Sequence, residues 1–384
     1  MFEYFPGNYV WNLGVVATLN SGGLIDEVDR ACRPIRDLAA QGSDVGTAEF
    51  MASWAAVAED LAAQAAAEEK AGHRRSAGQK YRRATNYLAQ AERMQRAHAP
   101  DRNVVYRRCL ELQQKVFDLI DPATTRVAVP FEGAHLPAYF TNASTGGTPA
   151  PCIILWNGLD STKEHMYASG FAGELAARGI STLMVDCPGS GEALRLHGLT
   201  ARVSTEDWAA ACVDHLEARG DVSRIGLVGW SLGGYYAPRA AAFERRLALC
   251  VAWGANHDWG AVQKRRLERE GENPVPHYWD HVLWVWGESD VDTFIDKAAA
   301  VNLDGVVERI TVPFLVVHGE NDRQIPLRYA HRSYEQAVNS PRRELRVFTA
   351  AEGGAEHIGL DHLSHVSVFI ADWVADVFKA GRDA

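Results

Sequence analysis

The sequence predicts an α/β protein: a mostly parallel sheet flanked by helices, preceded by a helical N-terminal domain. Between residues 24 and 120, apolar residues recur every three or four positions, which is typical of amphipathic helices. After Pro122, short apolar runs alternate with helical segments, as expected for strands of a parallel sheet that is covered on both faces. These runs are "CIILWNG" (152–158), "STLMVDCPG" (181–189), "RIGLVGWS" (224–231), "LALCVAWG" (247–254) and "FLVVHGEND" (314–322).

The predicted helical domain spans residues 1–121. Its two clearest helices are "AEFMASWAAVAEDLAAQAAAEEKAG" (48–72) and "SAGQKYRRATNYLAQAERMQRA" (76–97), with a break expected at Gly72. Two helices joined by a short turn predict a helical hairpin. No third copy follows at a fixed period, so a helical domain is favoured over a repeat solenoid.

The second predicted domain spans residues 122–384 and contains all five apolar runs. It opens with "TRVAVPFEGAHLPAYFTN" (125–142), whose alternation around Gly133 predicts an antiparallel hairpin. An aromatic-rich insert is expected at about 260–300, between two of the strands. Active sites of such sheets lie at the carboxyl ends of the strands, where each run ends in glycine or polar residues.

Composition and charge exclude several classes of function. The chain is 47% hydrophobic and 23% charged, with a net charge of −10, which argues against nucleic acid as a partner. The basic stretch 73–83 is typical of the solvated face of a helix. No apolar run approaches the ~18 residues that span a bilayer, and no basic leader precedes one, so no membrane partner is expected.

The cysteines and glycines indicate neither a disulfide framework nor a cofactor. Six cysteines are scattered without a CxxC pair, which predicts reduced thiols in a cytoplasmic protein. Neither a metal-ligand cluster nor a dinucleotide fingerprint nor a phosphate-binding loop is visible, so we expect no metal and no cofactor.

The stretch "IGLVGWSLGGYYAPRAAA" (225–242) carries the strongest functional signal. Gly229, Ser231 and Gly233 form the pattern G-x-S-x-G between a predicted strand and a predicted helix. In this motif the turn that carries the serine is so sharp that side chains two residues before or two residues after it would collide with neighbouring backbone. The pattern predicts Ser231 as a nucleophile above a helix N-terminus, with the N–H of Leu232 directed at developing negative charge.

A serine nucleophile needs a base and an orienting acid, which follow it in the order acid, then histidine. Asp322, at the end of the strand run "FLVVHGEND", is the favoured acid, with Glu320 and Asn321 as nearby rivals. The alternative interpretation of Asp322 is a turn carboxylate that caps the helix beginning near Pro326.

The base is expected on the glycine-rich loop after the last strand. His357 in "VFTAAEGGAEHIGLDHL" (347–363) lies there, ahead of the closing helix. His362 and His365 are the competitors, more typical of solvent-facing positions on that helix. The second oxyanion donor is assigned to the N–H of Leu159, on the loop where Gly158 permits close backbone approach.

The motifs together resemble one group of the α/β-hydrolase superfamily, the 2,6-dihydroxypseudooxynicotine hydrolase and FrsA-like group, which is related to fungal polyketide-shortening hydrolases. The similar segments are "NGLDSTKE" (157–164), "DCPGSGEA" (186–193), "GWSLGGYYA" (229–237), "HGENDRQIP" (318–326), "EGGAEH" (352–357) and "KYRRATNYLAQAE" (80–92). The resemblance implies an α/β-hydrolase fold whose N-terminal helices close over the active site. It assigns the triad to Ser231, Asp322 and His357 and allows a homodimer through the helical domain.

Further substrate-contacting or acid–base residues are less firmly indicated. The carbon–carbon hydrolases of this group use an extra acidic residue near the strand after the serine, where Asp258 and His257 are the candidates here. Trp230 and Trp284 are candidate substrate contacts. The aromatic residues of the insert predict either a pocket for an aryl or polyketide-like substrate or a packing surface for the helical domain.

The leading hypothesis is a serine hydrolase that forms an acyl-enzyme and cleaves a carbon–carbon bond beside a ketone in an aromatic or polyketide-like small molecule. The alternatives are a carboxylesterase or an acyltransferase with the same nucleophile. A binding protein with an inactive hydrolase domain is the remaining possibility, and the intact set of motifs argues against it.

Overall fold

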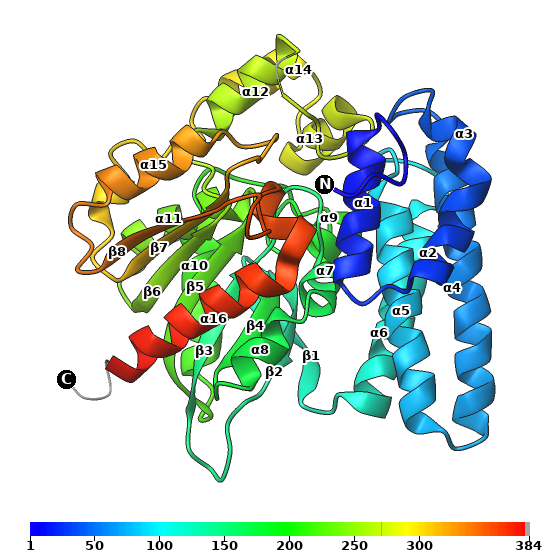
Figure 1. Cartoon of the computed structure of the whole chain (residues 1–384). Helices are drawn as coiled ribbons and strands as arrows, with labels where there is room; N and C mark the ends of the chain where they lie inside the picture. The colour runs from blue at the N-terminus through cyan, green and yellow to red at the C-terminus, as the bar shows by residue number, and fades with distance from the viewer. Residues whose placement is uncertain (270, 381–384) are drawn as a thin grey trace.

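A computed structural model describes residues 1–269 and 271–380, and its centre is an eight-stranded, mostly parallel sheet (Figure 1). The strand order is β1-β2-β4-β3-β5-β6-β7-β8, with β1–β2 and β2–β4 antiparallel and the remaining pairs parallel. The predicted fold class is confirmed. The strands are β1 Thr124–Phe131, β2 Ala134–Thr141, β3 Ala150–Trp156, β4 Ser181–Val185, β5 Val222–Trp230, β6 Leu247–Trp253, β7 Phe314–Gly319 and β8 Arg343–Phe348.

The central strands are apolar because helices cover both faces of the sheet. Every residue of β3, β4 and β7 is buried. One face packs against α10 and α11, and the other against α8 and α16, which crosses the front of Figure 1. Outside the insert between β6 and β7, the α-helices after β3 are α7 Lys163–Ala168, α8 Phe171–Ala176, α9 Gly191–Arg195, α10 Glu206–Glu217, α11 Gly233–Phe243, α15 Leu327–Gln336 and α16 Leu363–Ala380.

The predicted antiparallel hairpin is β1–β2, and the geometry of its turn accounts for the glycine at position 133. Glu132 and Gly133 have φ of 47° and 77°, so both central residues of the two-residue turn are left-handed. This geometry matches the twist of the flanking strands and favours glycine at its second position. The register pairs Phe131 with Ala134.

Six α-helices and one 3₁₀-helix precede the sheet and lie together on one side of it, at the right of Figure 1. The expected break after "EEKAG" is found, since α4 ends at Lys70, α5 begins at Arg74 and Gly72 has φ of 83°. The elements are α1 Tyr9–Asn20, α2 Ile25–Cys32, η1 Arg33–Ile35, α3 Arg36–Ala39, α4 Thr47–Lys70, α5 Arg74–Arg93 and α6 Arg102–Ile120.

Helix α1 begins before the region that the sequence pattern predicted to be helical. Nine of its twelve residues are buried, so it shows no polar face and no helical periodicity. Its neighbours are α2 and α5 on one side and the 3₁₀-helix η3 (His357–His362) on the other. It therefore connects the helical region to the carboxyl edge of the sheet.

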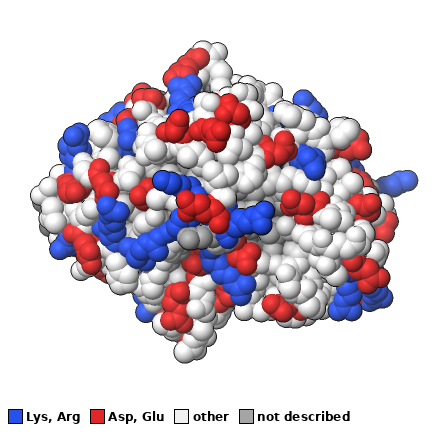
Figure 2. Space-filling model, turned by 90° about the horizontal axis from the view of Figure 1, so that it is seen from above, with Lys and Arg blue, Asp and Glu red and all other residues white. Residues whose placement is uncertain are grey.

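The insert between β6 and β7 forms α12 Trp259–Leu267, α13 Tyr278–Trp286 and α14 Val291–Ala298, at the top of Figure 1, followed by η2 Val307–Arg309. On the face shown in Figure 2, Lys and Arg side chains are interspersed with Asp and Glu side chains. Within the described residues, none of the helices combines the length and apolar character that a membrane crossing requires.

Candidate active site

Ser231 occupies a strained turn between β5 and α11. It has φ of 57°, which is uncommon for a residue with a side chain, and its N–H donates to the carbonyl oxygen of Trp253 at 2.8 Å. A β-carbon on Gly229 would lie 2.1 Å from the carbonyl oxygen of Gly233, and one on Gly233 would lie 2.9 Å from that of Asn157. The two glycines are therefore required by close backbone approach, as the motif predicts.

His357 lies in the loop after β8 and reaches the serine. Its Nε2 is 2.9 Å from Ser231 Oγ, and the ring is buried. The next residue, Ile358, has φ of 47°, and its carbonyl oxygen accepts a hydrogen bond from Trp253 Nε1 at 2.8 Å. Trp253 of β6 is therefore hydrogen-bonded both to the backbone of Ser231 and to the residue that follows His357.

Asp361 stabilises the loop that carries His357. Its carboxylate accepts hydrogen bonds from the N–H groups of Gly354, Ala355 and Glu356, at 2.9, 3.2 and 2.9 Å. These three residues lead directly into His357. The sequence analysis did not identify this role, because the bonds run from Asp361 back to residues five to seven positions earlier, a spacing that no local turn pattern indicates.

Asp322 completes the chain of hydrogen bonds. Its Oδ2 lies 2.8 Å from His357 Nδ1, while its Oδ1 accepts the N–H groups of Gln324 and Ile325 at 2.8 and 2.9 Å. Burial alone would raise the pKa of Asp322, but the charge and hydrogen bond of His357 outweigh it, and the pKa is lowered. An ionised Asp322 only accepts, so Nδ1 carries a proton and Nε2 accepts the Ser231 hydroxyl proton.

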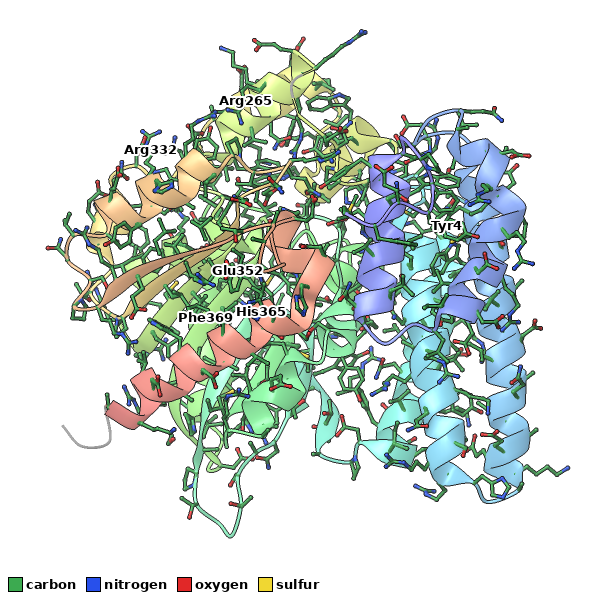
Figure 3. All side chains as sticks on the ribbon, in the orientation of Figure 1. Tyr4, Arg265, Arg332, Glu352, His365 and Phe369 are labelled. Atoms are coloured by element: carbon green, nitrogen blue, oxygen red, sulfur yellow. The ribbon has the colours of Figure 1, made fainter. Side chains whose placement is uncertain are left out.

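The rival acids and bases point elsewhere. Glu320 is exposed and accepts the N–H of Ala350 at 2.5 Å, and Asn321 is exposed as well. His362 and His365 are exposed, and the ring of His365 packs edge-on against Phe348 with centroids 5.2 Å apart. Figure 3 shows His365 and Phe369 on α16, with Glu352 on the loop above them.

The loop after β3 approaches the serine at Gly158. A β-carbon built there would lie 3.0 Å from Ser231 Oγ and 3.1 Å from the backbone nitrogen of Leu232. Among the described residues, neither the N–H of Leu159 nor that of Leu232 has a hydrogen-bond acceptor. Both predicted oxyanion donors are thus free of intramolecular partners, and that of Leu232 adjoins the hydroxyl.

His257 and Asp258 are engaged away from the serine. Asp258 caps α12 by accepting the N–H of Ala261 at 3.0 Å. His257 is buried between Ser333 Oγ and Asp304 Oδ1, at 2.9 and 3.0 Å, and burial, only partly offset by Asp304, lowers its pKa. Neither lines the cavity at Ser231, so the structure does not support either as an acid or base there.

The two tryptophan candidates have different surroundings. Trp230 lines the cavity beside Ser231, and its Nε1 donates to Ser161 Oγ at 3.2 Å. Trp284 lies outside that lining; the guanidinium carbons of Arg102 and Arg195 lie 4.5 and 5.6 Å from its ring centroid. Since Arg102 belongs to α6, Trp284 is part of the packing surface for the helical region, which was one of the two predicted alternatives.

A cavity adjoins Ser231 and His357. The helical region supplies one wall through α1 and α5, and the loop 157–162, α7 and η3 supply the others. Sequence reasoning missed the polar members from α5 and α7, because polar positions on a buried helix face show no partner until segments distant in sequence meet. The cavity-lining side chains absent from the predictions include Leu13, Gln90, Arg93, His165, Gln324 and Leu360.

Buried charges join the helical region to the sheet. Glu92 of α5 accepts two hydrogen bonds from Arg195 of α9, at 2.7 and 2.9 Å, and another from Arg102 of α6. All three side chains are at most 1% exposed. Burial alone would raise the pKa of Glu92, yet the two guanidinium groups lower it to about 2.

The six cysteines are buried and unpaired, as the scattered spacing predicts. Across residues 1–269 and 271–380, no three His, Cys, Asp or Glu side chains are grouped as metal ligands would be.

Comparisons with known proteins bear on the fold and the family. The sequence profile of the Alpha/beta hydrolase family matches residues 153–380. A 2,6-dihydropseudooxynicotine hydrolase from Paenarthrobacter nicotinovorans is 30% identical over 351 residues, covering 86% of this chain and 84% of that protein. Alpha/beta hydrolase ucsC from an Acremonium species is 29% identical over 330 residues, covering 77% of this chain and 63% of that protein.

A crystal structure of 2,6-dihydroxy-pseudo-oxynicotine hydrolase superimposes with a TM-score of 0.76 and 25% identity, over 95% of this chain and 96% of that one. This similarity therefore includes the N-terminal helices as well as the sheet. The family profile covers more than half of the chain. The resemblance identified from the sequence motifs is confirmed, and the chain belongs to the Alpha/beta hydrolase family.

Proposed function

We propose that this protein is a serine hydrolase with Ser231 as nucleophile, His357 as general base and acid, and Asp322 as the group that orients and stabilises the imidazole. The observation that supports the proposal most strongly is the continuous hydrogen-bonded chain from Ser231 Oγ through His357 to Asp322, at 2.9 and 2.8 Å. It opens onto a cavity and lies beside an unpartnered backbone N–H.

In this proposal the reaction proceeds through an acyl-enzyme. Ser231 Oγ attacks the carbonyl carbon while His357 Nε2 takes its proton, and the oxyanion accepts the N–H groups of Leu159 and Leu232. The tetrahedral intermediate then expels its leaving group, which takes the proton from His357. Water, deprotonated by His357, then attacks the acyl carbon. The second tetrahedral intermediate expels Ser231 Oγ, which takes that proton back from His357, and the acid product leaves.

We further propose that the cleaved bond joins the carbonyl carbon to another carbon, as in an aryl ketone or a diketone. The group that the motifs resemble includes enzymes that cleave such bonds, and the similarity extends over the helices that wall the cavity. A carbon leaving group must be protonated within the site. His257 and Asp258 are occupied elsewhere, so His357, protonated in the first step, supplies this proton.

The serine step is tested by labelling with a fluorophosphonate, which reacts with activated serine hydroxyls. Wild-type protein is expected to be labelled at Ser231, and S231A is not. Ser161 lines the same cavity without a histidine partner, so S161A serves as the matched control and is expected to remain labelled. A folded wild-type protein that fails to react would contradict the proposal.

The bond that is cleaved is tested with a substrate panel of β-diketones, acylphenols and 4-nitrophenyl esters of equal acyl length. Products are identified by mass spectrometry. Cleavage of the diketones or acylphenols between carbonyl and neighbouring carbon, lost in S231A, is the expected result. Rapid turnover of the esters alone would leave the serine hydrolase in place and refute the carbon–carbon assignment.

A further inference from the structure

His165, on α7, lines the cavity at Ser231 and carries a buried hydrogen-bond donor without an acceptor among the described residues. Its Nδ1 accepts the N–H of Thr162 at 3.2 Å, which caps the start of α7. Since Nδ1 is an acceptor, a neutral imidazole must carry its proton on Nε2. The ring lines the same cavity as Ser231 and His357.

Nε2 of His165 is buried, and among the described residues nothing accepts its proton. Burial, followed by the charge of Arg93, lowers the pKa of His165 to about 4, so the ring is neutral near pH 7. A buried donor without an acceptor is unfavourable, because it has lost its hydrogen bond to water and gained none in return. A ligand that supplies an acceptor removes this cost.

Of the side chains that line the cavity, the acidic Asp160 and the basic Arg93 are paired with each other. Arg93 Nε donates to Asp160 Oδ2 at 2.7 Å, and its terminal nitrogen donates to the carbonyl oxygen of Pro274 at 2.9 Å. Gln90 of α5 also lines the cavity, and its buried Nε2 is a second donor without an acceptor among the described residues. This end of the cavity therefore offers donors and no net charge, which suits an uncharged oxygen rather than a carboxylate or an ammonium group.

Helices α5 and α7 meet where the helical region adjoins the sheet (Figure 1). The geometry points to a substrate-recognition role: we propose that His165 Nε2–H donates a hydrogen bond to a second, uncharged oxygen of the substrate, apart from the carbonyl that Ser231 attacks. The proposal rests on the proposed function and narrows its substrate class to molecules with two oxygen functions, such as diketones and keto esters.

Two substitutions separate the two nitrogens of His165. In His165→Asn the amide oxygen stands near the position of Nδ1 and preserves the acceptor for Thr162, but the Nε2 donor is lost. In His165→Gln the amide nitrogen reaches the position of Nε2 and preserves the donor, while the cap of α7 is lost. Both are made in the full-length Ser231→Ala protein, so that binding is measured without turnover.

The probes are 1-phenylhexan-1-one and its 1,3-, 1,4- and 1,5-diones, whose dissociation constants are measured by isothermal titration calorimetry. In Ser231→Ala, at least one dione is expected to bind about 10-fold more tightly than the monoketone, the gain from pairing one buried donor. His165→Asn is expected to reduce that preference to within about 2-fold, and His165→Gln to retain it.

Thermal unfolding establishes that each variant is folded before binding is compared. The proposal is overturned if no dione is preferred, if His165→Asn keeps the preference, or if His165→Gln loses it as His165→Asn does. Because the readout is binding, it is independent of fluorophosphonate labelling and product formation in the wild-type protein. Failure of the proposed function and failure of this recognition role are therefore distinguishable.

Discussion

Gly158 approaches Ser231 so closely that a β-carbon built on Gly158 would stand 2.8 Å from the β-carbon of the serine and 3.0 Å from its Oγ. The same atom would lie 3.1 Å from the backbone nitrogen of Leu232. The absence of a side chain at Gly158 therefore leaves space open beside both the hydroxyl and an unpartnered N–H. In the proposed mechanism this is where the oxyanion forms.

Gly158→Ala is expected to lower kcat/KM by about 100- to 1,000-fold, comparable to the loss of an oxyanion donor. The added methyl group displaces the oxyanion from the N–H groups and crowds Ser231 Oγ, while the loop stays on the surface of an intact sheet. The measurement is hydrolysis of the best substrate found in the panel, with circular dichroism to verify the fold.

Gly173→Ala, in α8, is the matched control, because a β-carbon built at Gly173 would have no described atom within 4 Å apart from its chain neighbours and the backbone of its own helix. Alanine also favours a helix over glycine, so activity within about 2-fold of wild type and equal or greater stability are expected. Equal losses of kcat/KM in the two variants would show that crowding at Ser231 does not cause the loss of activity.

Asp322→Asn is expected to lower kcat by about 10⁴-fold with little change in KM. The asparagine Oδ1 can still accept the N–H groups of Gln324 and Ile325. Its Nδ2, however, would face His357 Nδ1 donor to donor, so the ring adopts the other tautomer and Nε2 can no longer take the Ser231 proton. Steady-state kinetics measure the effect.

Glu320→Gln tests the alternative acid on the same turn. Glu320 is exposed, and its carboxylate accepts the N–H of Ala350, a bond that the amide oxygen of glutamine can also accept. Within residues 1–269 and 271–380 no hydrogen bond connects this side chain to His357, so we expect kcat within about 2-fold of wild type. A large loss in Glu320→Gln with a small loss in Asp322→Asn would reverse the assignment of the acid.

The strands, and the three residues that the structure joins by hydrogen bonds at Ser231, could be predicted because both leave local signals. Buried parallel strands are short continuous apolar runs, and the sharp turn at Ser231 requires glycines at fixed spacing. The chain order of nucleophile, acid and base then restricts Asp322 and His357 to the loops after late strands. Choosing between Asp322 and Glu320 still depended on which side chain faces inward, and the structure shows this directly.

The cavity could not be predicted in the same way. Helix α1 is apolar on all sides and therefore shows no periodicity, although it supplies part of the wall. Gln90, Arg93 and His165 belong to two helices more than 60 residues apart in sequence, and their polarity becomes informative only when they meet. The two interpretations of the aromatic insert likewise required the contact between Trp284 and Arg102.

Glu92→Gln is expected to lower the free energy of unfolding by about 3–5 kcal/mol, because it leaves Arg102 and Arg195 buried without their counter-charge. Removal of Glu92 also loosens the contact between α5 and α9, which positions the helical wall of the cavity. We expect KM to rise more than kcat falls. Urea unfolding and steady-state kinetics are the measurements.

Glu59→Gln provides the control within the helical region. Glu59 pairs with Arg108 at 2.9 Å, but its side chain is 48% exposed, and exposed pairs contribute about 0–1 kcal/mol. A loss below about 1 kcal/mol is therefore expected. If the two substitutions destabilise the protein equally, burial of the Glu92 network is not what stabilises the contact.

The dependence of stability on pH distinguishes the stabilisation that comes from the charge of Glu92 from the stabilisation that comes from the packing of its side chain. The two guanidinium groups hold the pKa of Glu92 at about 2, against an ordinary value of 4.5, so the ionised form is favoured in the folded state. A lowered pKa contributes stability that is complete above pH 4.5 and is lost as the pH falls towards 2. Over that range the loss amounts to about 3 kcal/mol.

Glu92→Gln lacks this contribution at every pH. The difference in unfolding free energy between wild type and Glu92→Gln is therefore expected to shrink by about 2 kcal/mol between pH 6 and pH 3. Urea titrations of both proteins at pH 6, 4 and 3 measure this difference. A difference that does not change with pH would mean that Glu92 acts through packing rather than through its charge.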